Sequence, residues 1–344
     1  MTLRVEGKLT NGKFEGITHI SNQHSLFTML ATDQRGSLKR MLNPEDPSSV
    51  TPEQLKEVKL ALIKNLAGRY SGSKASGVLV DPEYSYEREF LEKCMIRADV
   101  GLLMSAEKSG YGGQGEFAPQ VSFFNGLDAE NAVASIKKRG ASAVKLLIYY
   151  RPDSPTAKHQ EKMVKAIGEA TVKYDIAFLL EVVVHSLEGG PHKKKNPKEF
   201  AKIKPQLVID SAKELTKPEY GVDILKAEFP VDLRYSEELG QSPSEWCKAL
   251  TEASQTPWVV LSAGVDFPLF KEQVLYASRN GASGFLAGRA IWKESVAMKN
   301  REEFLRTTGV ERLNTIADIV NTYATPWYKK YVDSLEEIEI IRGE

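Results

Sequence analysis

The chain has 344 residues, a formal net charge of zero and a hydrophobic fraction of 42%, which is enough apolar material for a large core. The balanced charge argues against a nucleic acid or an anionic membrane as a partner. No apolar stretch follows the charges of the first sixteen residues, and no run of about 18 apolar residues occurs. We therefore expect neither a secretory signal nor a membrane span. The two cysteines lack CxxC spacing, which argues against a disulfide framework or a cysteine-rich zinc site and favours a cytoplasmic protein.

Eight short apolar runs recur along the chain and are typical of buried strands. They span residues 26–36, 76–84, 100–110, 142–152, 177–186, 222–232, 257–266 and 282–292. Helical patterns separate most of them, at 51–70, 128–140, 157–175 and 271–281. Strands that alternate with helices in this way indicate a parallel sheet covered by helices. Eight such units predict an α/β fold of the (β/α)8 TIM-barrel type. A doubly wound open sheet is the alternative, weakened because no GxGxxG follows the first strand.

Two segments lie outside the predicted barrel core, which we place at about residues 25–310 of a single domain spanning 1–344. Residues 2–18 alternate around an Asn-Gly pair, which predicts an N-terminal β-hairpin across one end of the barrel. Residues 313–344 predict a C-terminal helical extension followed by an acidic tail. The basic loop at 189–199 has the composition of a solvated surface loop, and a lid over an anionic substrate is the alternative.

Four aromatic residues lie near the C-terminus. They are Tyr323, Trp327, Tyr328 and Tyr331. Such a group either packs the terminal helix on the barrel or forms an interface between subunits. We expect a homo-oligomer.

The run 222–232 carries Lys226 and Glu228 in an otherwise apolar strand. Side chains of a barrel strand alternate between the surrounding helices and the barrel interior. Because Leu225, Ala227 and Phe229 form the apolar face, the two charged residues face inward near the C-terminal end of the strand, where barrel active sites lie. Burial favours the neutral form of an amine, and a neutral lysine attacks carbonyls to form a Schiff base. A Lys–Glu pair that only fills the barrel is the alternative.

The neighbouring strands also end in polar or charged groups. Glu181 lies in the fifth strand, beside the sixth, and is the natural proton shuttle for the addition of an amine to a carbonyl. Lys145 in the fourth strand adds a second cation that can bind anionic substrate oxygens. The first three strands end in Asp33, Gln34 and Arg35, in Asp81 and Glu83, and in Glu107 and Lys108. Charges at six consecutive strand ends are difficult to explain by packing alone, so we predict one common site, with Glu107 and Glu228 among its substrate-binding residues.

The last two strands carry the pattern of a phosphate site. The seventh ends in Ser262 and Gly264, and the eighth in Gly288 and Arg289. The loops after these two strands are the usual phosphate site of the fold. Small residues let backbone N–H groups approach an oxyanion, and arginine binds it with two parallel hydrogen bonds.

These residues lie in stretches that resemble a known family. The stretches are DQRGSLKRML, LVDPEYSY, AEKSGY, AVKLLIYY, FLLEVVV, FAKIKPQ, VDILKAEFPV, LSAGV and GRAIW. In this order they resemble the tagatose-1,6-bisphosphate aldolases, which are class I, Schiff-base aldolases with a (β/α)8 fold. The resemblance runs from about residue 25 to the end of the eighth strand and continues weakly past 306–309.

The resemblance implies a role for each matching residue. The D-V-L-K-V-E-x-P strand of the family makes Lys226 the Schiff-base lysine, and its F-L-E-V motif makes Glu181 the acid/base group. The resemblance also carries over Asp33, Gln34, Arg35, Lys145, Ser262 and Arg289 from the matching motifs. The choice of Lys226 over Lys145 as nucleophile rests on the resemblance, since strand alternation leaves both open.

A sister group is also similar. PWVVLSAGVD and GASGFLAGRAIW are closer to the 6-deoxy-6-sulfofructose-1-phosphate aldolases. Both groups release dihydroxyacetone phosphate, and the second product is glyceraldehyde 3-phosphate or sulfolactaldehyde. DPEYS, AEKSGY and the longer chain favour the bisphosphate branch, whereas VVVHS after Glu181 matches neither group closely.

We therefore expect a class I aldolase that cleaves a ketohexose phosphate, foremost tagatose 1,6-bisphosphate, with a phosphorylated sugar as its partner and no metal or other cofactor. The five histidines form no ligand-spaced cluster, and a local hydrogen bond suits His185 better than a substrate contact. A metal-dependent aldolase or isomerase on the same barrel and a non-catalytic sugar-phosphate sensor are the alternatives.

Overall fold

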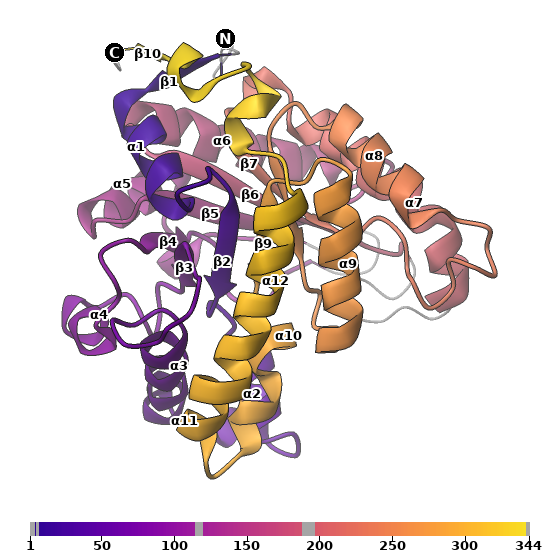
Figure 1. Ribbon diagram of the computed structural model, residues 1–344. Helices are drawn as coiled ribbons and strands as arrows, with labels where there is room; N and C mark the ends of the chain where they lie inside the picture. Colours follow the sequence, from indigo (N-terminus) through magenta and orange to yellow (C-terminus); the bar gives the residue numbers. More distant parts are fainter. Residues whose placement is uncertain (1–3, 5–6, 114–119, 188–196, 342–344) are drawn as a thin grey trace.

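Eight parallel strands close into a barrel in the computed structural model, which describes residues 4, 7–113, 120–187 and 197–341 (Figure 1). The strands follow one another around the barrel in chain order, and the last pairs with the first. They are β2 (Phe27–Ala31), β3 (Gly77–Val80), β4 (Gly101–Ser105), β5 (Ala143–Tyr150), β6 (Ala177–Val184), β7 (Ile224–Glu228), β8 (Trp258–Leu261) and β9 (Gly284–Ala287). The predicted (β/α)8 barrel is confirmed, and the open-sheet alternative is wrong because the sheet has no edge.

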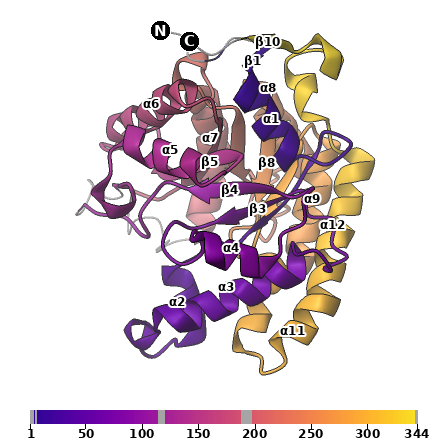
Figure 2. The same ribbon diagram turned by 90° about the vertical axis from the view of Figure 1, so that its left-hand side faces the viewer.

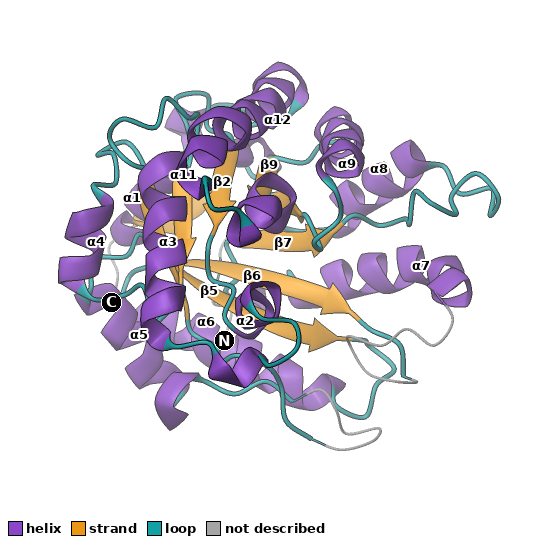
Figure 3. Cartoon of the chain, turned by 90° about the horizontal axis from the view of Figure 1, so that it is seen from below, coloured by secondary structure: helices purple, strands orange, loops and turns teal. Residues whose placement is uncertain are grey.

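Helices surround the strands (Figures 2 and 3). They are α2 (Gly36–Leu42), α3 (Pro52–Leu66), α4 (Arg88–Cys94), α5 (Ala129–Lys138), α6 (Ala157–Lys173), α7 (Pro197–Leu215), α8 (Pro243–Ala253), α9 (Phe267–Arg279), α10 (Arg289–Trp292), α11 (Arg301–Phe304) and α12 (Val310–Tyr323). The start of α3 shows why these residues form a helix: Thr51 and Gln54 cap each other's backbone N–H groups, and Pro52 occupies the first turn. None of the described helices combines the length and the hydrophobicity that a membrane-spanning helix requires.

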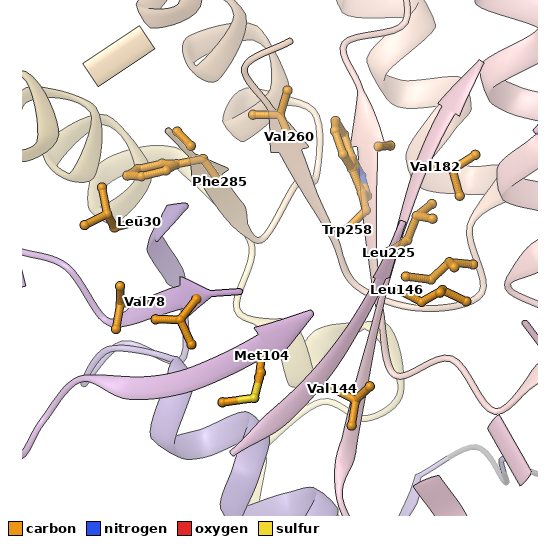
Figure 4. Packing of buried hydrophobic residues seen from close by; sticks show 14 of the residues in the cluster. Leu30, Val78, Met104, Val144, Leu146, Val182, Leu225, Trp258, Val260 and Phe285 are labelled. Carbon is orange, nitrogen blue, oxygen red and sulfur yellow. The ribbon is translucent and has the colours of Figure 1, made fainter. Parts of the chain in front are cut away.

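The main core lies between the barrel and the helices. Figure 4 shows side chains of this cluster that come from all eight barrel strands and point away from the barrel interior. On β7 these outward residues are Leu225 and Ala227, and Phe229 follows them. The predicted apolar face of this strand is therefore confirmed.

The barrel interior has two layers of opposite character. Leu179 and Ile224 lie side by side near the N-terminal ends of β6 and β7, in an apolar cluster that fills this half of the barrel. Two residues later on the same strands, Glu181 lies beside Lys226. The period of two thus places the charged pair directly above an apolar floor.

The prediction of an N-terminal β-hairpin is wrong. Residues 8–10 form a short strand, β1 (Lys8–Thr10), which pairs in parallel with β10 (Glu339–Ile341) at the other end of the chain. The Asn-Gly pair begins a helix, α1 (Asn11–Ile20), because Asp175 accepts hydrogen bonds from the backbone N–H groups of Gly12 (2.9 Å) and Lys13 (3.2 Å). This cap comes from a distant residue, and it outweighs the local preference of Asn-Gly for a tight turn.

Helix α1 closes the N-terminal end of the barrel. Its Ile17 and Ile20 are buried in the same apolar cluster as Leu179. The indole of Trp327 is buried there as well, with Tyr328 and Tyr331 packed against the cluster. Three of the four C-terminal aromatics therefore pack within the chain.

The C-terminal helical extension is confirmed by α12, and part of the acidic tail forms β10. Most of the basic loop at 189–199 lies outside the described residues, and its last three residues begin α7.

We predict that Lys13→Met lowers the free energy of unfolding by about 3 kcal/mol, since it leaves a buried charge without its partner. Lys13 Nζ lies 2.5 Å from Asp223, and both side chains are at most 5% exposed. Chemical unfolding followed by circular dichroism measures the change. The exposed Lys8–Glu339 pair supplies the control, because Lys8→Met should cost less than about 1 kcal/mol. An equally small loss for both variants would contradict the prediction.

Candidate active site

A cavity of about 660 Å³ opens at the C-terminal end of the barrel. It is lined by the predicted site residues Asp33, Gln34, Arg35, Glu107, Lys145, Glu181, Lys226, Glu228, Ser262, Gly288 and Arg289. Gly264, which was also predicted to bind substrate, lies beside the Arg289 guanidinium. The residues come from seven of the eight barrel strands or the loops that follow them, so the fold alone brings them together. The volume suits a small organic substrate.

Lys145 lies at the centre of a cluster of carboxylates. Its Nζ is 2.9 Å from Asp33, 2.6 Å from Glu107 and 2.9 Å from Glu181. Burial opposes the charged amine, but the three carboxylates outweigh burial and hold the pKa of Lys145 well above its ordinary value. Lys145 is therefore a fixed cation, and all three of its N–H bonds have acceptors.

Glu181 bridges the two buried lysines. Its Oε2 lies 2.9 Å from Lys145 Nζ and its Oε1 lies 2.9 Å from Lys226 Nζ. Burial would raise the pKa of Glu181, yet the two lysines outweigh burial and lower it. A carboxylate in hydrogen-bond contact with an amine, held from behind by a second cation, can pass protons to and from that amine.

Glu107 and Glu228 are fixed by the barrel itself. Glu107 binds Lys145 through Oε1 and accepts the backbone N–H of Leu147 (3.1 Å) through Oε2. Glu228 accepts the backbone N–H of Val184 at 2.8 Å, and its other oxygen is 3.7 Å from Lys204. Because protein groups already engage their oxygens, this geometry suits positioning better than the direct substrate contact that the sequence suggested.

The loops after β8 and β9 form a cradle around a guanidinium. Ala263 and Gly264 both adopt positive φ angles, +47° and +80°, which turns the backbone after Ser262. A Cβ atom at Gly264 would lie 3.1 Å from Cζ of Arg289, so glycine leaves room for the guanidinium. Within the described part of the chain, no carboxylate pairs with Arg289. Such a cradle is suited to a phosphate group.

The segment after β2 presents further polar atoms. Gln34 Oε1 and Arg35 Nη1 are buried and have no hydrogen-bond partner among the described residues. The other terminal nitrogen of Arg35 donates to the Glu107 carbonyl at 2.8 Å. A Cβ atom at Gly288 would lie 3.0 Å from Gln34 Nε2 and 2.6 Å from a backbone oxygen of β2, so this glycine permits the close approach of the two segments.

Some residues of the site were missed from the sequence. Arg40 on α2, Tyr111 after β4 and Tyr149 on β5 line the cavity. Tyr149 lies on the inward face of its strand, four residues after Lys145, so strand alternation could have identified it. Burial and the nearby Glu181 raise the pKa of its phenol to about 12, which keeps the hydroxyl protonated.

Two strand-end charges do not join the site. Asp81 forms a buried ion pair with Lys59 of α3, at 2.8 Å, and Glu83 lies 4.0 Å from Arg35 without lining the cavity. The ring of His185 bonds locally, with Nδ1 3.0 Å from the Ser186 carbonyl oxygen, as expected. In the stretches that the structure describes, no group of three or more histidine, cysteine or acidic side chains has the arrangement of a metal site.

A group of buried charges at the C-terminal end of a (β/α)8 barrel is typical of an enzyme active site. The sequence model of the DeoC/LacD family of aldolases matches residues 27–294. The tagatose 1,6-diphosphate aldolases of Lactococcus lactis subsp. lactis and Streptococcus pneumoniae (strain ATCC BAA-255 / R6) are 34% and 33% identical to this chain. Each alignment covers 94% of this chain and 99% of the relative. The chain therefore belongs to the DeoC/LacD family of aldolases and is a lyase.

Solved structures of other aldolases share the fold. A Schiff-base-forming fructose-1,6-bisphosphate aldolase is 18% identical with a TM-score of 0.55, and the match covers 88% of this chain and 99% of that one. A fructose-bisphosphate aldolase from Plasmodium falciparum is 13% identical with a TM-score of 0.62, covering 92% and 97%. At these identities the likeness shows the barrel fold alone.

We predict a pH-dependent contribution of Asp33 to stability. Burial would raise the pKa of Asp33, but Lys145 and Lys226 outweigh burial and lower it. A lowered pKa stabilises the fold above the ordinary carboxyl pKa of about 4, and the contribution is lost as the pH falls towards the folded value. The cost of Asp33→Asn should therefore be largest near pH 7.

Chemical unfolding of wild type and Asp33→Asn between pH 7 and pH 3 measures this cost. It should shrink by at most about 1.4 kcal/mol per pH unit below pH 4. The exposed Glu89→Gln on α4 controls for the loss of a charge. If the cost of Asp33→Asn stayed constant between pH 7 and pH 3, the lowered pKa of Asp33 would be contradicted.

Proposed function

We propose that this protein is a class I, Schiff-base aldolase that cleaves tagatose 1,6-bisphosphate to dihydroxyacetone phosphate and glyceraldehyde 3-phosphate. One observation carries the mechanism: Glu181 lies between Lys226 and the fixed cation Lys145, at 2.9 Å from each. The names of the two bacterial relatives support the substrate. The reaction needs no metal, because an iminium group takes the place of a Lewis acid.

Lys226 is the nucleophile in this proposal. The nitrogen lone pair of its neutral amine attacks the C2 carbonyl, and Glu181 moves the proton from nitrogen to oxygen. Loss of water leaves an iminium on C2. Once the C4 hydroxyl gives its proton to a base, for which Glu181 is again the nearest candidate, the C3–C4 electron pair moves to the iminium and the aldehyde leaves. The resulting enamine is protonated at C3, and water releases dihydroxyacetone phosphate.

The fixed charges divide the remaining work. Lys145 cannot act as the nucleophile while three carboxylates keep it protonated, so it orients Glu181 and Asp33. Asp33 lies where it can hold substrate hydroxyls, and Glu107 anchors Lys145. The C1 phosphate binds to Ser262, to the backbone at Gly264 and to Arg289, far from the bond that breaks. Binding energy from such a remote group contributes to catalysis by positioning the reacting centre.

A second anionic group of the substrate would meet cations other than Arg289. Arg35 has a buried nitrogen without a hydrogen-bond partner among the described residues, and Arg40 on α2 and Lys108 after β4 line the same cavity. Arg35 and Arg40 follow the first barrel strand, which pairs with the eighth strand that precedes Arg289, and Lys108 follows the third. Several cations besides Arg289 in one cavity suit a substrate with two anionic groups, which supports a bisphosphate.

Trapping with borohydride tests the nucleophile. After incubation with dihydroxyacetone phosphate and reduction, we predict a stable adduct on Lys226, located by digestion and mass spectrometry. Lys226→Met should form none while retaining the circular dichroism spectrum of the wild type. An adduct on Lys145 would keep the Schiff-base class and overturn the assignment. No adduct in a folded, ligand-binding protein would move the mechanism to a metal-dependent enzyme or a non-catalytic sensor.

Steady-state kinetics test the second anion. Losing one charged hydrogen bond costs about 1.5–3 kcal/mol, so Arg40→Met should raise KM for tagatose 1,6-bisphosphate about tenfold or more. The same variant should trap dihydroxyacetone phosphate as well as the wild type does, since that ligand lacks the second anion. Arg289→Met is the matched control and should impair both reactions. Faster cleavage of 6-deoxy-6-sulfofructose 1-phosphate than of the bisphosphate would instead assign the enzyme to the sulfosugar group.

A further inference from the structure

A lysine occupies a core position of α3, among residues that should be apolar. Leu55, Lys59, Leu62 and Leu66 follow the helical spacing of the buried stripe, and all four side chains are fully buried. A charge in this place is unfavourable unless it is paired and hydrogen-bonded. The contacts of Lys59 therefore need an explanation beyond packing.

The three N–H bonds of Lys59 have three separate acceptors. Its Nζ lies 2.8 Å from Asp81 Oδ2, 2.5 Å from the Thr32 carbonyl oxygen and 2.9 Å from the Gln34 carbonyl oxygen. The two carbonyls belong to the residues on either side of Asp33. Lys59 thus donates hydrogen bonds to the backbone on both sides of Asp33, whose carboxylate lies in the candidate active site.

Both carboxylate oxygens of Asp81 also have hydrogen-bond partners. Its Oδ1 accepts the backbone N–H groups of Glu83 (2.9 Å) and Tyr84 (2.7 Å), and its Oδ2 accepts the hydroxyl of Ser85 at 2.6 Å. The ion pair with Lys59 has 0% exposure on both sides. Asp81 follows β3, the strand next to β2, so it fixes Lys59 against the neighbouring strand of the barrel.

The segment from Thr32 to Gln34 needs such a support because it lies past the end of β2. Thr32 still donates its backbone N–H to Leu79 of β3 at 2.9 Å, but the two residues after it have left the strand. The carboxylate of Asp33 must nevertheless meet Lys145 at 2.9 Å. A replacement of a buried ion pair by apolar residues often leaves stability unchanged or higher, so stability alone does not account for the pair.

We propose that Lys59 and Asp81 are positioning residues for catalysis: they clamp the carbonyls of Thr32 and Gln34 and thereby hold the Asp33 carboxylate against Lys145. The proposal extends the proposed function, since it assigns work to a pair outside the cavity. The pair acts through Asp33 and contacts no substrate.

A double-mutant cycle on turnover of tagatose 1,6-bisphosphate tests the proposal. Lys59→Met should lower kcat at least tenfold, whereas in the Asp33→Asn background the same change should lower it less than twofold, because the group it positions is gone. An equal loss in both backgrounds would show that Lys59 does not act through Asp33. Unchanged kcat in folded Lys59→Met would also overturn the proposal.

Two further variants separate positioning from folding. Lys59→Met combined with Asp81→Asn leaves no unpaired charge, and the amide oxygen introduced at position 81 can still accept the two backbone N–H groups, so this double variant should fold and still show low kcat. Lys13→Met is the matched control, because it breaks another buried ion pair at the opposite end of the barrel. It should lower stability and leave kcat within twofold of the wild type.

Hydrogen exchange provides a readout that does not depend on the substrate. In the double variant of Lys59 and Asp81, the amides of residues 32–36 should exchange at least tenfold faster than in the wild type, and in Lys13→Met they should not change. Unchanged exchange would overturn the clamp. Faster exchange in a protein whose wild type fails to cleave the bisphosphate would instead show that the clamp exists and that the proposed function is wrong.

Discussion

The contact between Glu181 and two buried lysines is the constraint on which the rest of the site depends. Three carboxylates surround Lys145, while among the described residues Lys226 shares one of them, Glu181, at 2.9 Å. The asymmetry separates two chemically identical side chains: three carboxylates hold Lys145 in the charged form, whereas Lys226 contacts Glu181. Neither lysine would be tolerable in the barrel without the carboxylates, and the carboxylates would not be tolerable without the lysines. The buried charges therefore stabilise one another, and in the proposed mechanism the same contacts prepare the site for catalysis.

The barrel makes this arrangement possible by dividing its interior into layers. An apolar layer lies near the N-terminal ends of the strands and is closed by α1 and Trp327. It keeps water from reaching the charged residues through that end of the barrel. Charged residues then occupy the next inward positions of β5, β6 and β7, where the pleat aims them at one another. Hydrogen bonds from backbone N–H groups of β5 and β6 hold Glu107 and Glu228 in place. The rigidity of the sheet is thus transferred directly to the side chains that surround the cavity.

Much of the barrel and of its inward-facing charges could be predicted from the sequence. Side chains alternate along β7, so if Leu225 and Ala227 face the helices, Lys226 must face inward. The same reasoning located Glu181 and Lys145, and the resemblance to an aldolase family ordered their roles. What failed were features that depend on contacts distant in sequence. The Asn-Gly pair begins a helix because Asp175, more than 160 residues away, caps it. Asp81 was grouped with the site because its partner Lys59 lies on a helix, where a lysine is ordinarily solvated. Arg40 was missed because it is a solvent-exposed arginine on a helix, and no sequence pattern marks such a residue as part of a site.

The pairing of β1 with β10 brings residues 8–10 and 339–341 together at the closed end of the barrel, beside α1 (Figure 1). The candidate active-site cavity opens at the other end, where the strands finish. An affinity tag, a fluorescent protein or a surface tether joined to the chain before β1 or after β10 would therefore be attached at the end of the barrel opposite the cavity mouth. The enzyme can be immobilised through its ends with its substrate entrance directed towards the solution, and a second catalytic domain fused to either end would receive the released aldehyde only after it had diffused around the barrel.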